Sequence, residues 1–404
     1  MDIVRFLYDK WPEAIMLRDD PYEALPIHKL CLNEMVDDNQ SLDILQFMIN
    51  IDPAMVRVDD EESNLPLHNA LTCKPFAFCK VLIDLYPESL KETTAMNGYL
   101  PIHLCCMSKG TDMNDALRYV LKIYPEGIKV RDSFGQLPIH RAAAEGSVDL
   151  IEILLMHDPD AATREVSHQR TWHLRLPLHI ACQRNDLMEV QVLYDVYPDA
   201  IDKSDRQGKT PLDLAREKSP LRHSMGASYH DAIINFIQTQ LAYSNQAQDT
   251  NLLSTPDQNG RLPLHHALKD GDPLGSIKLL LRGNLSAIRV PDNNMTFPIH
   301  LACEFCSAKV VRYLIELDDI PVKSLDVNKD SILHYACRGA KLDVVQYLLT
   351  NYTSLVPSAM MNTQNELPIH VLCEAGKDKV DCESSEYIET IWQMLLANPE
   401  ALMS

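Results

Sequence analysis

The feature that most constrains this chain is a four-residue motif, Leu-Pro-(Ile/Leu)-His, that recurs along its whole length. Ten copies or near variants occur, and successive fourth residues are 40, 35, 37, 39, 34, 52, 35, 34 and 36 residues apart. A period near 35 with one interruption is typical of a solenoid, in which each repeat contacts only its neighbours. The copies are LPIH at 25–28, LPLH at 65–68, LPIH at 100–103 and 137–140, LPLH at 176–179, TPLD at 210–213, LPLH at 262–265, FPIH at 297–300, SILH at 331–334 and LPIH at 367–370.

The stretch 132–161 shows the secondary structure expected of one repeat. Asp132 and Gly135 are turn residues ahead of the motif, and Pro138 suits the first turn of a helix, where its missing N–H is no loss. Gly146 then suits a tight turn before a second helix. The apolar residues of that second helix fall on one helical face, at i, i+3, i+6 and i+7: Val148, Ile151, Leu154 and Leu155. The sequence therefore predicts an all-α array of stacked helix pairs.

Two stretches carry a family resemblance most clearly, DRQGKTPLDLA at 205–215 and DQNGRLPLHHAL at 257–268. They resemble the ankyrin repeat, a unit of about 33 residues with a Thr-Pro-Leu-His-x-Ala core. The resemblance covers nearly the whole chain. It implies an ankyrin-repeat solenoid of helix-turn-helix units with short hairpin loops, about ten motif cores and a leading half repeat at 4–15.

The chain departs from the ankyrin pattern in two ways. Leu replaces the family's threonine in most copies, and the copy that keeps Thr210 has Asp213 in place of histidine, so the hydrogen bond between threonine and histidine is not expected here. The second helices also end at proline where the family usually has glycine. Proline bars continuation of the helix, so we expect helix stops at Pro12, Pro53, Pro87, Pro125, Pro159, Pro198 and Pro399.

The step of 52 residues marks the main internal boundary. A polar loop at 218–227 precedes an expected helix at about 229–241, and residues 242–256 have the composition of a linker. Two organisations are open: one continuous stack with a hairpin insertion, or arrays at 1–241 and 257–404 joined by a linker at 242–256. Both ends of the sequence lack a polar capping helix, which favours a fragment of a longer protein over end helices with unusual caps.

Composition limits the classes of partner and compartment. The formal charge is −20, which argues against nucleic acid and anionic membranes, because both need a cationic surface. There is no long apolar run and no signal peptide, so the cytoplasm is expected, with the nucleus as the alternative. Eleven cysteines fit a reducing compartment. Six of them share one repeat position and are expected to be small buried side chains: Cys31, Cys106, Cys182, Cys303, Cys337 and Cys373.

The residues that could carry chemistry have structural interpretations. Motif histidines in successive repeats should lie about 8 to 10 Å apart, too far to share one zinc ion. The pair Cys303 and Cys306 has no partner pair at zinc-finger spacing, and Gly208-Lys209-Thr210 lies in an expected hairpin rather than a phosphate loop. No enzyme activity, metal, cofactor or small-molecule substrate is predicted.

The sequence instead predicts a scaffold or adaptor that binds a partner protein on its concave face. Hairpin tips and the ends of first helices are the partner-contacting positions that the family resemblance implies. One pair of repeats is rich in cationic and aromatic residues there, the types enriched at binding hot spots, and we expect it to receive an acidic segment. Its residues are Trp172, His173, Arg175, Gln183, Arg184, Arg206 and Lys209. The alternative is a regulatory or targeting segment of a larger enzyme or membrane protein.

Overall fold

The computed structural model describes residues 2–19, 23–108, 112–167, 174–184, 186–217, 226–247, 253–318, 320–352, 359–379 and 384–397. Within these ranges the regular structure is helical and no strand occurs, so the predicted all-α class is confirmed. The chain divides into two compact units, Met1–Ile237 and Gln238–Ser404, which we call the N-terminal unit and the C-terminal unit.

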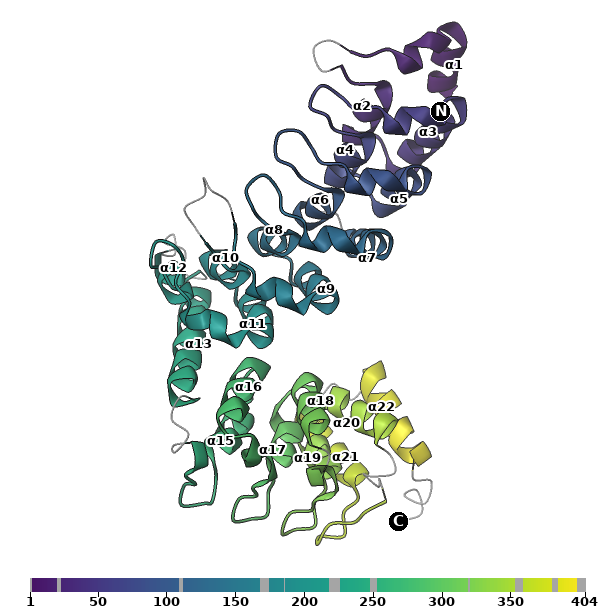
Figure 1. The fold of residues 1–404 in the computed structure, drawn as a ribbon. Coiled ribbons are helices and arrows are strands. Elements are labelled where there is room, and N and C mark those ends of the chain that lie inside the picture. Colours follow the sequence, from purple (N-terminus) through teal and green to yellow (C-terminus); the bar gives the residue numbers. More distant parts are fainter. Residues whose placement is uncertain are drawn as a thin grey trace. The chain divides into compact units, whose positions relative to one another are not determined.

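In most repeats a first helix begins at the motif and a second helix packs against it. Within each unit the first helices form one row, next to the hairpins, and the second helices form another (Figure 1). The first helices are α2 (Pro26–Leu32), α4 (Pro66–Cys73), α6 (Pro101–Met107), α8 (Pro138–Glu145), α10 (Pro177–Arg184), α12 (Pro211–Glu217), α15 (Pro263–Lys269), α17 (Pro298–Phe305), α19 (Ile332–Arg338) and α21 (Pro368–Lys379). The second helices are α1 (Asp2–Lys10), α3 (Asp38–Ile51), α5 (Phe76–Leu85), α7 (Met113–Ile123), α9 (Val148–His157), α11 (Leu187–Val196), α13 (Gly226–Ala247), α16 (Leu274–Gly283), α18 (Ala308–Leu317), α20 (Leu342–Asn351) and α22 (Ser385–Ala397).

The prolines after the second helices begin a third element that the sequence pattern missed. Pro159 stops α9 as expected, but it also occupies the first position of a 3₁₀ helix, η5, which buries Ala161 and Ala162. Proline's fixed φ suits a helical start, so the residue that ends one helix begins the next. A helix pair is therefore an incomplete description of the repeat. The 3₁₀ helices are η1 (Pro12–Met16), η2 (Pro53–Arg57), η3 (Pro87–Lys91), η4 (Pro125–Lys129), η5 (Pro159–Thr163), η6 (Pro198–Asp202), η7 (Leu285–Arg289) and η8 (Ile320–Lys323), and Pro399 lies outside the described residues.

The region of the long step is partly helical. The helix expected at 229–241 is present as α13, which continues to Ala247 and so includes the first six residues of the expected linker at 242–256. Leu253, in the same stretch, is buried in the core of the C-terminal unit, and residues 248–252 lie outside the described ranges. A linker between two independently folding arrays stays a prediction.

The cysteines that share one repeat position are buried, as predicted, with one exception. Five of the six cysteines at that position are buried, and Cys373 is exposed. Cys373 lies on α21, against which α19 packs from one side. The other side of α21 carries no further first helix among the described residues, which explains why the prediction of burial was wrong there.

Candidate binding surface

Five motif histidines bond through Nε2 to a backbone carbonyl 24 to 32 residues further along the chain: His28, His68, His179, His300 and His334. The Nε2 atoms of His103, His140 and His265 are buried without a hydrogen-bond partner among the described residues. In His300, Nδ1 accepts a hydrogen bond from the backbone N–H of Phe297 at 3.0 Å. Because Nδ1 accepts, the proton lies on Nε2, which donates to the carbonyl oxygen of Ser324 at 3.1 Å. Burial lowers the pKa of His300 to about 4, which keeps the ring neutral. The structure thus places this motif side chain between two backbone segments, with no free nitrogen for chemistry.

The same backbone bond explains how the motif works without threonine. Leu137 stands at the N-cap of α8, and its backbone N–H donates to Nδ1 of His140 at 3.1 Å. The histidine therefore still accepts a hydrogen bond at the start of the helix, although the threonine is absent. Where a hydroxyl is available a second bond forms, from Thr210 Oγ1 to Asp213 at 2.7 Å. The hydrogen bond at the start of the first helix, which we did not expect from the sequence, is therefore present, but in most repeats a backbone N–H donates it and no threonine hydroxyl takes part.

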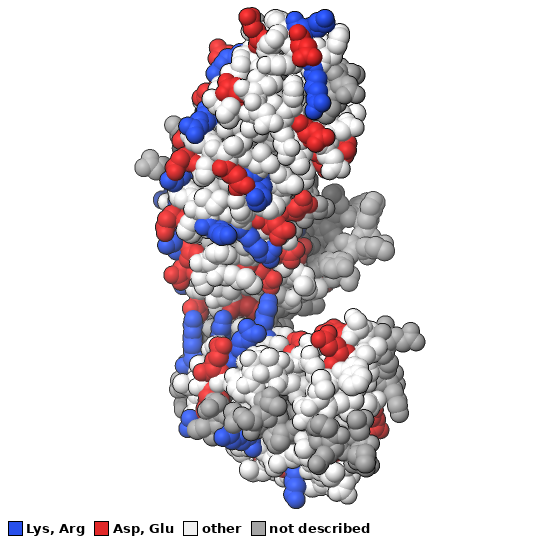
Figure 2. Space-filling view, turned by 90° about the vertical axis from the view of Figure 1, so that its right-hand side faces the viewer, with Lys and Arg blue, Asp and Glu red and all other residues white. Residues whose placement is uncertain are grey.

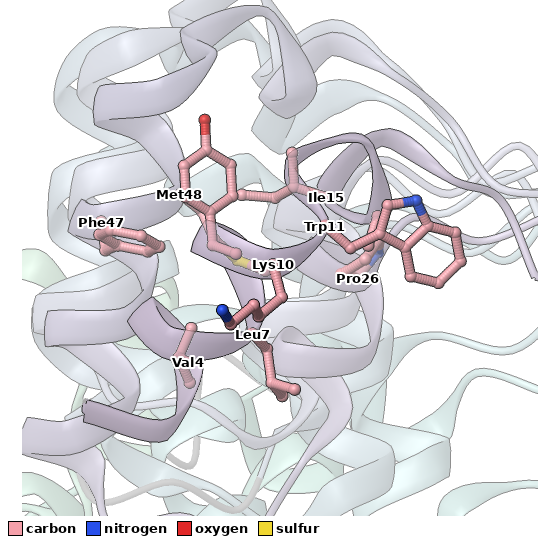
Figure 3. Close-up of a pocket in the computed structure, with 10 residues that line it drawn as sticks. Val4, Leu7, Lys10, Trp11, Ile15, Pro26, Phe47 and Met48 are labelled. Carbon is pink, nitrogen blue, oxygen red and sulfur yellow. The ribbon is translucent and has the colours of Figure 1, made fainter.

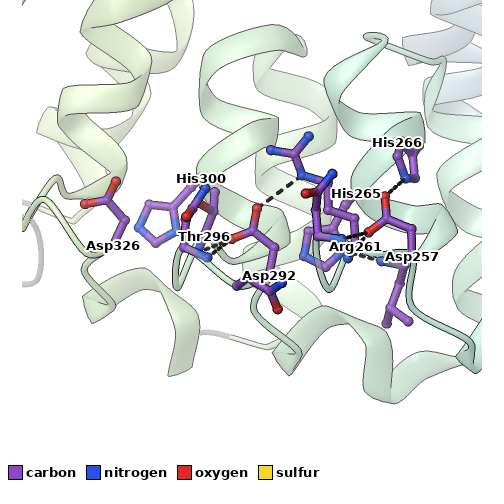
Figure 4. Close-up of polar contacts among 12 residues, drawn as sticks. Asp257, Arg261, His265, His266, Asp292, Thr296, His300 and Asp326 are labelled. Carbon is purple, nitrogen blue, oxygen red and sulfur yellow. Dashed lines mark hydrogen bonds and ion pairs between the residues drawn. The ribbon is translucent and has the colours of Figure 1, made fainter.

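An aspartate at the start of most hairpins organises the loop. In Asp292, Oδ1 accepts hydrogen bonds from the backbone N–H groups of Asn294 and Thr296, both at 2.9 Å (Figure 4). The equivalent Oδ1 of Asp257 accepts from residues 259 and 261, and other hairpins repeat the pattern. Adjacent hairpins are also joined, since the N–H of Asn293 donates to the carbonyl of Asn259 at 2.9 Å. The hairpin tips are therefore a fixed row rather than loose loops.

The second carboxylate oxygen of these aspartates, Oδ2, accepts a hydrogen bond from a cationic side chain or from another donor. Arg261 Nε donates to Asp292 Oδ2 of the next hairpin at 3.2 Å. The N-terminal unit repeats this contact between Arg175 and Asp205, at 3.0 Å. The carboxylates of Asp292 and Asp205 are almost fully buried, so each arginine neutralises a charge that would otherwise be unpaired inside the protein. An arginine directly before the motif thus locks two repeats together.

A polar groove of about 460 Å³ lies on the hairpin side of the C-terminal unit. Its walls are the hairpin tips with Asn294, Val327 and Asn328, and the last turns of α15, α17 and α19. The side-chain amides of Asn294 and Asn328 form no hydrogen bond with any described residue. Lys269, at the end of α15, likewise forms no ion pair with a described residue.

The floor of the groove is held rigidly. Tyr335 donates its hydroxyl hydrogen bond to Asp326 Oδ2 at 2.9 Å, and Arg338 stacks on the Tyr335 ring with 4.8 Å between its guanidinium carbon and the ring centre. Arg338 also bonds to Asp330. These contacts fix the Tyr335 and Arg338 side chains beside the amides of Asn294 and Asn328. Sequence reasoning missed this groove because its residues are ordinary asparagine and valine, although they occupy hairpin-tip positions.

The predicted cationic site in the N-terminal unit is partly used by the array itself. Trp172 and His173 lie outside the described residues. Arg175 bonds to Asp205 and to Gln183 Oε1, the latter at 2.8 Å, and its side chain is mostly buried.

The remaining members of the predicted site lie nearer the surface. Lys209 pairs with Glu217 at 2.6 Å, and Arg184 is exposed but donates to the carbonyl of Ala144. Arg206 is exposed, and its side chain forms no hydrogen bond or ion pair with the described residues. Gln183, Arg184 and Arg206 are therefore the described members of the site that a partner could reach.

The second-helix side of the N-terminal unit has a different character. Acidic and basic side chains are interspersed over this face (Figure 2). Lys80 pairs with Asp84 along α5 at 2.7 Å, and Arg118 pairs with Asp115 along α7. Such exposed pairs contribute little to stability, but they leave no continuous field of one sign on that face.

The cysteine pair is buried and protonated. Cys303 and Cys306 are almost inaccessible, and Cys306 Sγ donates to the carbonyl of Leu268 at 3.3 Å. Burial raises the pKa of Cys306 to about 12, so the thiol does not ionise near neutral pH. Among the described residues no three His, Cys, Asp or Glu side chains gather as a metal site would need. No described helix combines the length and apolar character needed to cross a bilayer.

The chain is similar to known repeat proteins. A family model described as ankyrin repeats (3 copies) matches residues 224–324 and 264–359. The "Probable 26S proteasome regulatory subunit p28" of Saccharomyces cerevisiae is 28% identical over 34% of this chain and 64% of its own length. Rabankyrin-5 of Mus musculus is 23% identical over 66% of this chain and 23% of its own. The "Transient receptor potential cation channel subfamily A member 1" of Drosophila melanogaster is 28% identical over 24% of this chain and 8% of its own. The chain thus spans less than two thirds of each of these relatives.

The family match and the geometry agree. The matched residues contain the motif copies from α15 to α19, with their paired helices and hairpins. The same first helix, second helix and hairpin recur outside the matched residues, from α2 to α11. The chain therefore contains ankyrin repeats at residues 224–359, and the repeats before them have the same architecture.

Proposed function

We propose that this chain is a non-catalytic scaffold or adaptor that binds a partner protein along its hairpin side. Ankyrin repeats are protein-interaction modules, and the family is generally non-catalytic. The observation that carries the proposal is the groove of the C-terminal unit, where unpaired amide side chains line a rigid concave surface. Array packing does not use these amides, so their hydrogen-bonding capacity is available to a partner.

The form of the groove favours an extended segment or loop of the partner. Asn294 and Asn328 each offer a donor and an acceptor to a peptide backbone, while the exposed Val327 offers apolar contact. The predicted cationic site of the N-terminal unit would add an acidic segment of the partner, through Arg184 and Arg206 in particular. Its charge would act mainly on the association rate, which salt would lower. The cytoplasm, with the nucleus as the alternative, is the proposed location.

The test begins with a partner captured from the native cell, whose affinity is then measured by isothermal titration calorimetry. Val327→Asp combined with Asn328→Ala should weaken binding by about tenfold or more, because it places a charge in the groove and removes one amide. Met156→Asp is the matched control, since Met156 is exposed on α9, away from the hairpins. Equal affinities for both variants would exclude the groove as the binding surface.

The cationic site needs a separate variant. Arg206→Glu tests it without disturbing the fold, whereas Arg175→Glu would leave the buried Asp205 beside a second negative charge. We expect weaker binding that becomes less salt-dependent. Unchanged affinity and salt dependence would remove Arg206 from the site.

The second candidate function is a regulatory or targeting segment of a larger enzyme or membrane protein. The similarity to part of a cation channel subunit and to part of the much longer Rabankyrin-5 supports keeping it. The reading frame of the full-length transcript distinguishes the two, since a catalytic or membrane domain joined to these residues would establish the second function.

A further inference from the structure

One apolar position is buried in second helix after second helix but exposed in α1. Leu7 lies five residues before Pro12, and 60% of its surface is exposed. The residues five before the equivalent prolines of five other repeats are at most 7% exposed: Met48, Leu82, Val120, Leu154 and Leu193. In those repeats the first helix packs on the second. Leu7 is therefore an exposed apolar side chain at a position that a first helix covers in those repeats.

Leu7 lines an apolar groove of about 490 Å³ between α1, η1, α2 and α3 (Figure 3). Val4, Leu7 and Trp11 form one side, and Phe47 lies on α3. Trp11 is 56% exposed, and Lys10 is the one charged side chain among the lining residues. Its shape and chemistry are those of a seat for an apolar helix face.

A matching helix face is exposed on α22. Ile388, Trp392 and Leu396 are spaced four residues apart, so they share one side of the helix, and they are 48%, 60% and 74% exposed. The opposite side of α22, with Thr390 and Met394, is buried, and the helix packs on α20 and α21. Three large apolar side chains in one exposed line are typical of an interaction site.

The position of this stripe in the repeat makes it unusual. When the buried Thr390 and Met394 are aligned with the buried Phe78 and Leu82 of α5, Trp392 corresponds to Lys80. Leu396 then corresponds to Asp84, the ion-pair partner of Lys80. Helix α22 thus carries apolar side chains where α5 carries a solvated ion pair.

We propose that the stripe of α22 from a second copy of this chain docks into the groove at α1. The interface continues a contact that the array already uses, a helix covering the position equivalent to Leu7. Charge also fits, because α22 carries the exposed Glu386 and Glu389 and no basic residue, whereas the groove contributes Lys10. The proposal does not depend on the hairpin-side function, because neither helix face belongs to the hairpin groove.

The contact joins two different surfaces, so each copy keeps one stripe and one groove free for further copies. Such a heterologous interface adds molecules head to tail, into rings or open chains. Three side chains and a groove of one helix width bury less than about 1,200 Å², the range of weak and transient interfaces. We therefore expect association that depends on concentration in the micromolar range.

Sedimentation velocity of the purified full chain tests the proposal, over a concentration series up to about 200 µM, a range chosen for a weak interface. The weight-average sedimentation coefficient should rise with concentration. Trp392→Glu and Leu7→Glu should each abolish that rise, since each places a charge in an apolar contact. Both residues are exposed, so both variants should keep the far-ultraviolet circular dichroism and the melting temperature of the parent. Met156→Glu is the matched control and should associate like the parent.

Mixing the two variants gives the decisive result. The Trp392→Glu chain keeps an intact groove, and the Leu7→Glu chain keeps an intact stripe, so an equimolar mixture should form dimers that cannot grow further. A parent chain that stays monomeric at every concentration would overturn the proposal. So would association that survives in either variant, or a mixture that stays monomeric. Loss of partner binding by the hairpin-groove variants would leave this result unchanged.

Discussion

Two kinds of buried titratable side chain act in opposite directions on stability. Eight motif histidines are buried, and burial lowers the pKa of each: His28, His68, His103, His140, His179, His265, His300 and His334. The ninth, His370, is exposed on α21. Glu189 on α11 is fully buried, and neither of its carboxylate oxygens has a hydrogen-bond partner among the described residues. Burial, with a smaller contribution from Asp186, raises the pKa of Glu189 to about 7.

The histidines should make the protein less stable as pH falls from 7 to 5. The unfolded chain binds protons near pH 6.5, whereas His103 and His300 stay neutral in the fold down to about pH 4. Each should therefore cost about 2 kcal/mol of unfolding free energy between pH 7 and pH 5. Urea unfolding followed by circular dichroism at the two pH values measures the loss. His300→Gln should reduce it and the exposed His157→Gln should not; equal pH dependence in the two variants would contradict the assignment.

Glu189 should act in the other direction, because its stabilising protonated form is lost as pH rises through 7. Glu189→Met has a similar volume and no charge to bury. We expect a gain of about 2 kcal/mol at pH 8 and a smaller gain at pH 5, where the native carboxyl is already neutral. Thermal melts at both pH values give the comparison. A destabilised variant at pH 8 would show that Glu189 has a binding partner in solution.

The hairpins are the elements that shape the proposed binding surface. An aspartate side chain closes most of the loops, and a backbone hydrogen bond joins many neighbouring loops, such as those of Asn259 and Asn293. Because these bonds are local, the hairpin geometry should survive changes elsewhere in the repeat. Loss of the aspartate should disturb the groove directly.

Asp292→Ala should destabilise the C-terminal unit by roughly 2 to 4 kcal/mol, since it leaves two N–H groups and Arg261 without their acceptor. Asp292→Asn is the matched variant, because it keeps the Oδ1 acceptor and loses only the charge. Hydrogen exchange read by mass spectrometry should show faster exchange at residues 292–296 in the alanine variant. Equal exchange in both variants would mean that the loop is held by other contacts.

At the scale of the molecule, the open question is how independently the two units fold. The pattern of contacts between residues places the boundary between the two units within α13. Each unit has its own stacked helices. In a repeat array, stability is nearly a sum of repeat and neighbour contributions, so a weak junction divides the folding transition.

Limited proteolysis should therefore cut first within residues 242–256 and release two folded fragments. Circular dichroism should show a separate cooperative melt for each purified fragment. A first cut elsewhere, or fragments that unfold once they are separated, would instead indicate one continuous stack.

The sequence by itself determined the repeat. Motif period, apolar spacing and the positions of proline and glycine all act through neighbouring residues of one helix or turn, so the helical class and the ankyrin stack could be predicted. The family resemblance also led us to propose the hairpin tips as binding positions. The Trp and Arg content of 172–184 directed attention to the N-terminal unit, yet Arg175 proved to be occupied by Asp205.

Only the tertiary structure decided which of these residues remain available. Asp205 lies 30 residues from Arg175, and Ser324 lies 24 residues from His300, so neither contact has a local signature in the chain. Leu7 and Cys373 carry the same apolar character as their buried equivalents, but no helix of the described residues covers them as a neighbouring helix covers the others. In a solenoid the burial of a residue depends on the adjacent repeat, and the residue's own repeat cannot specify it.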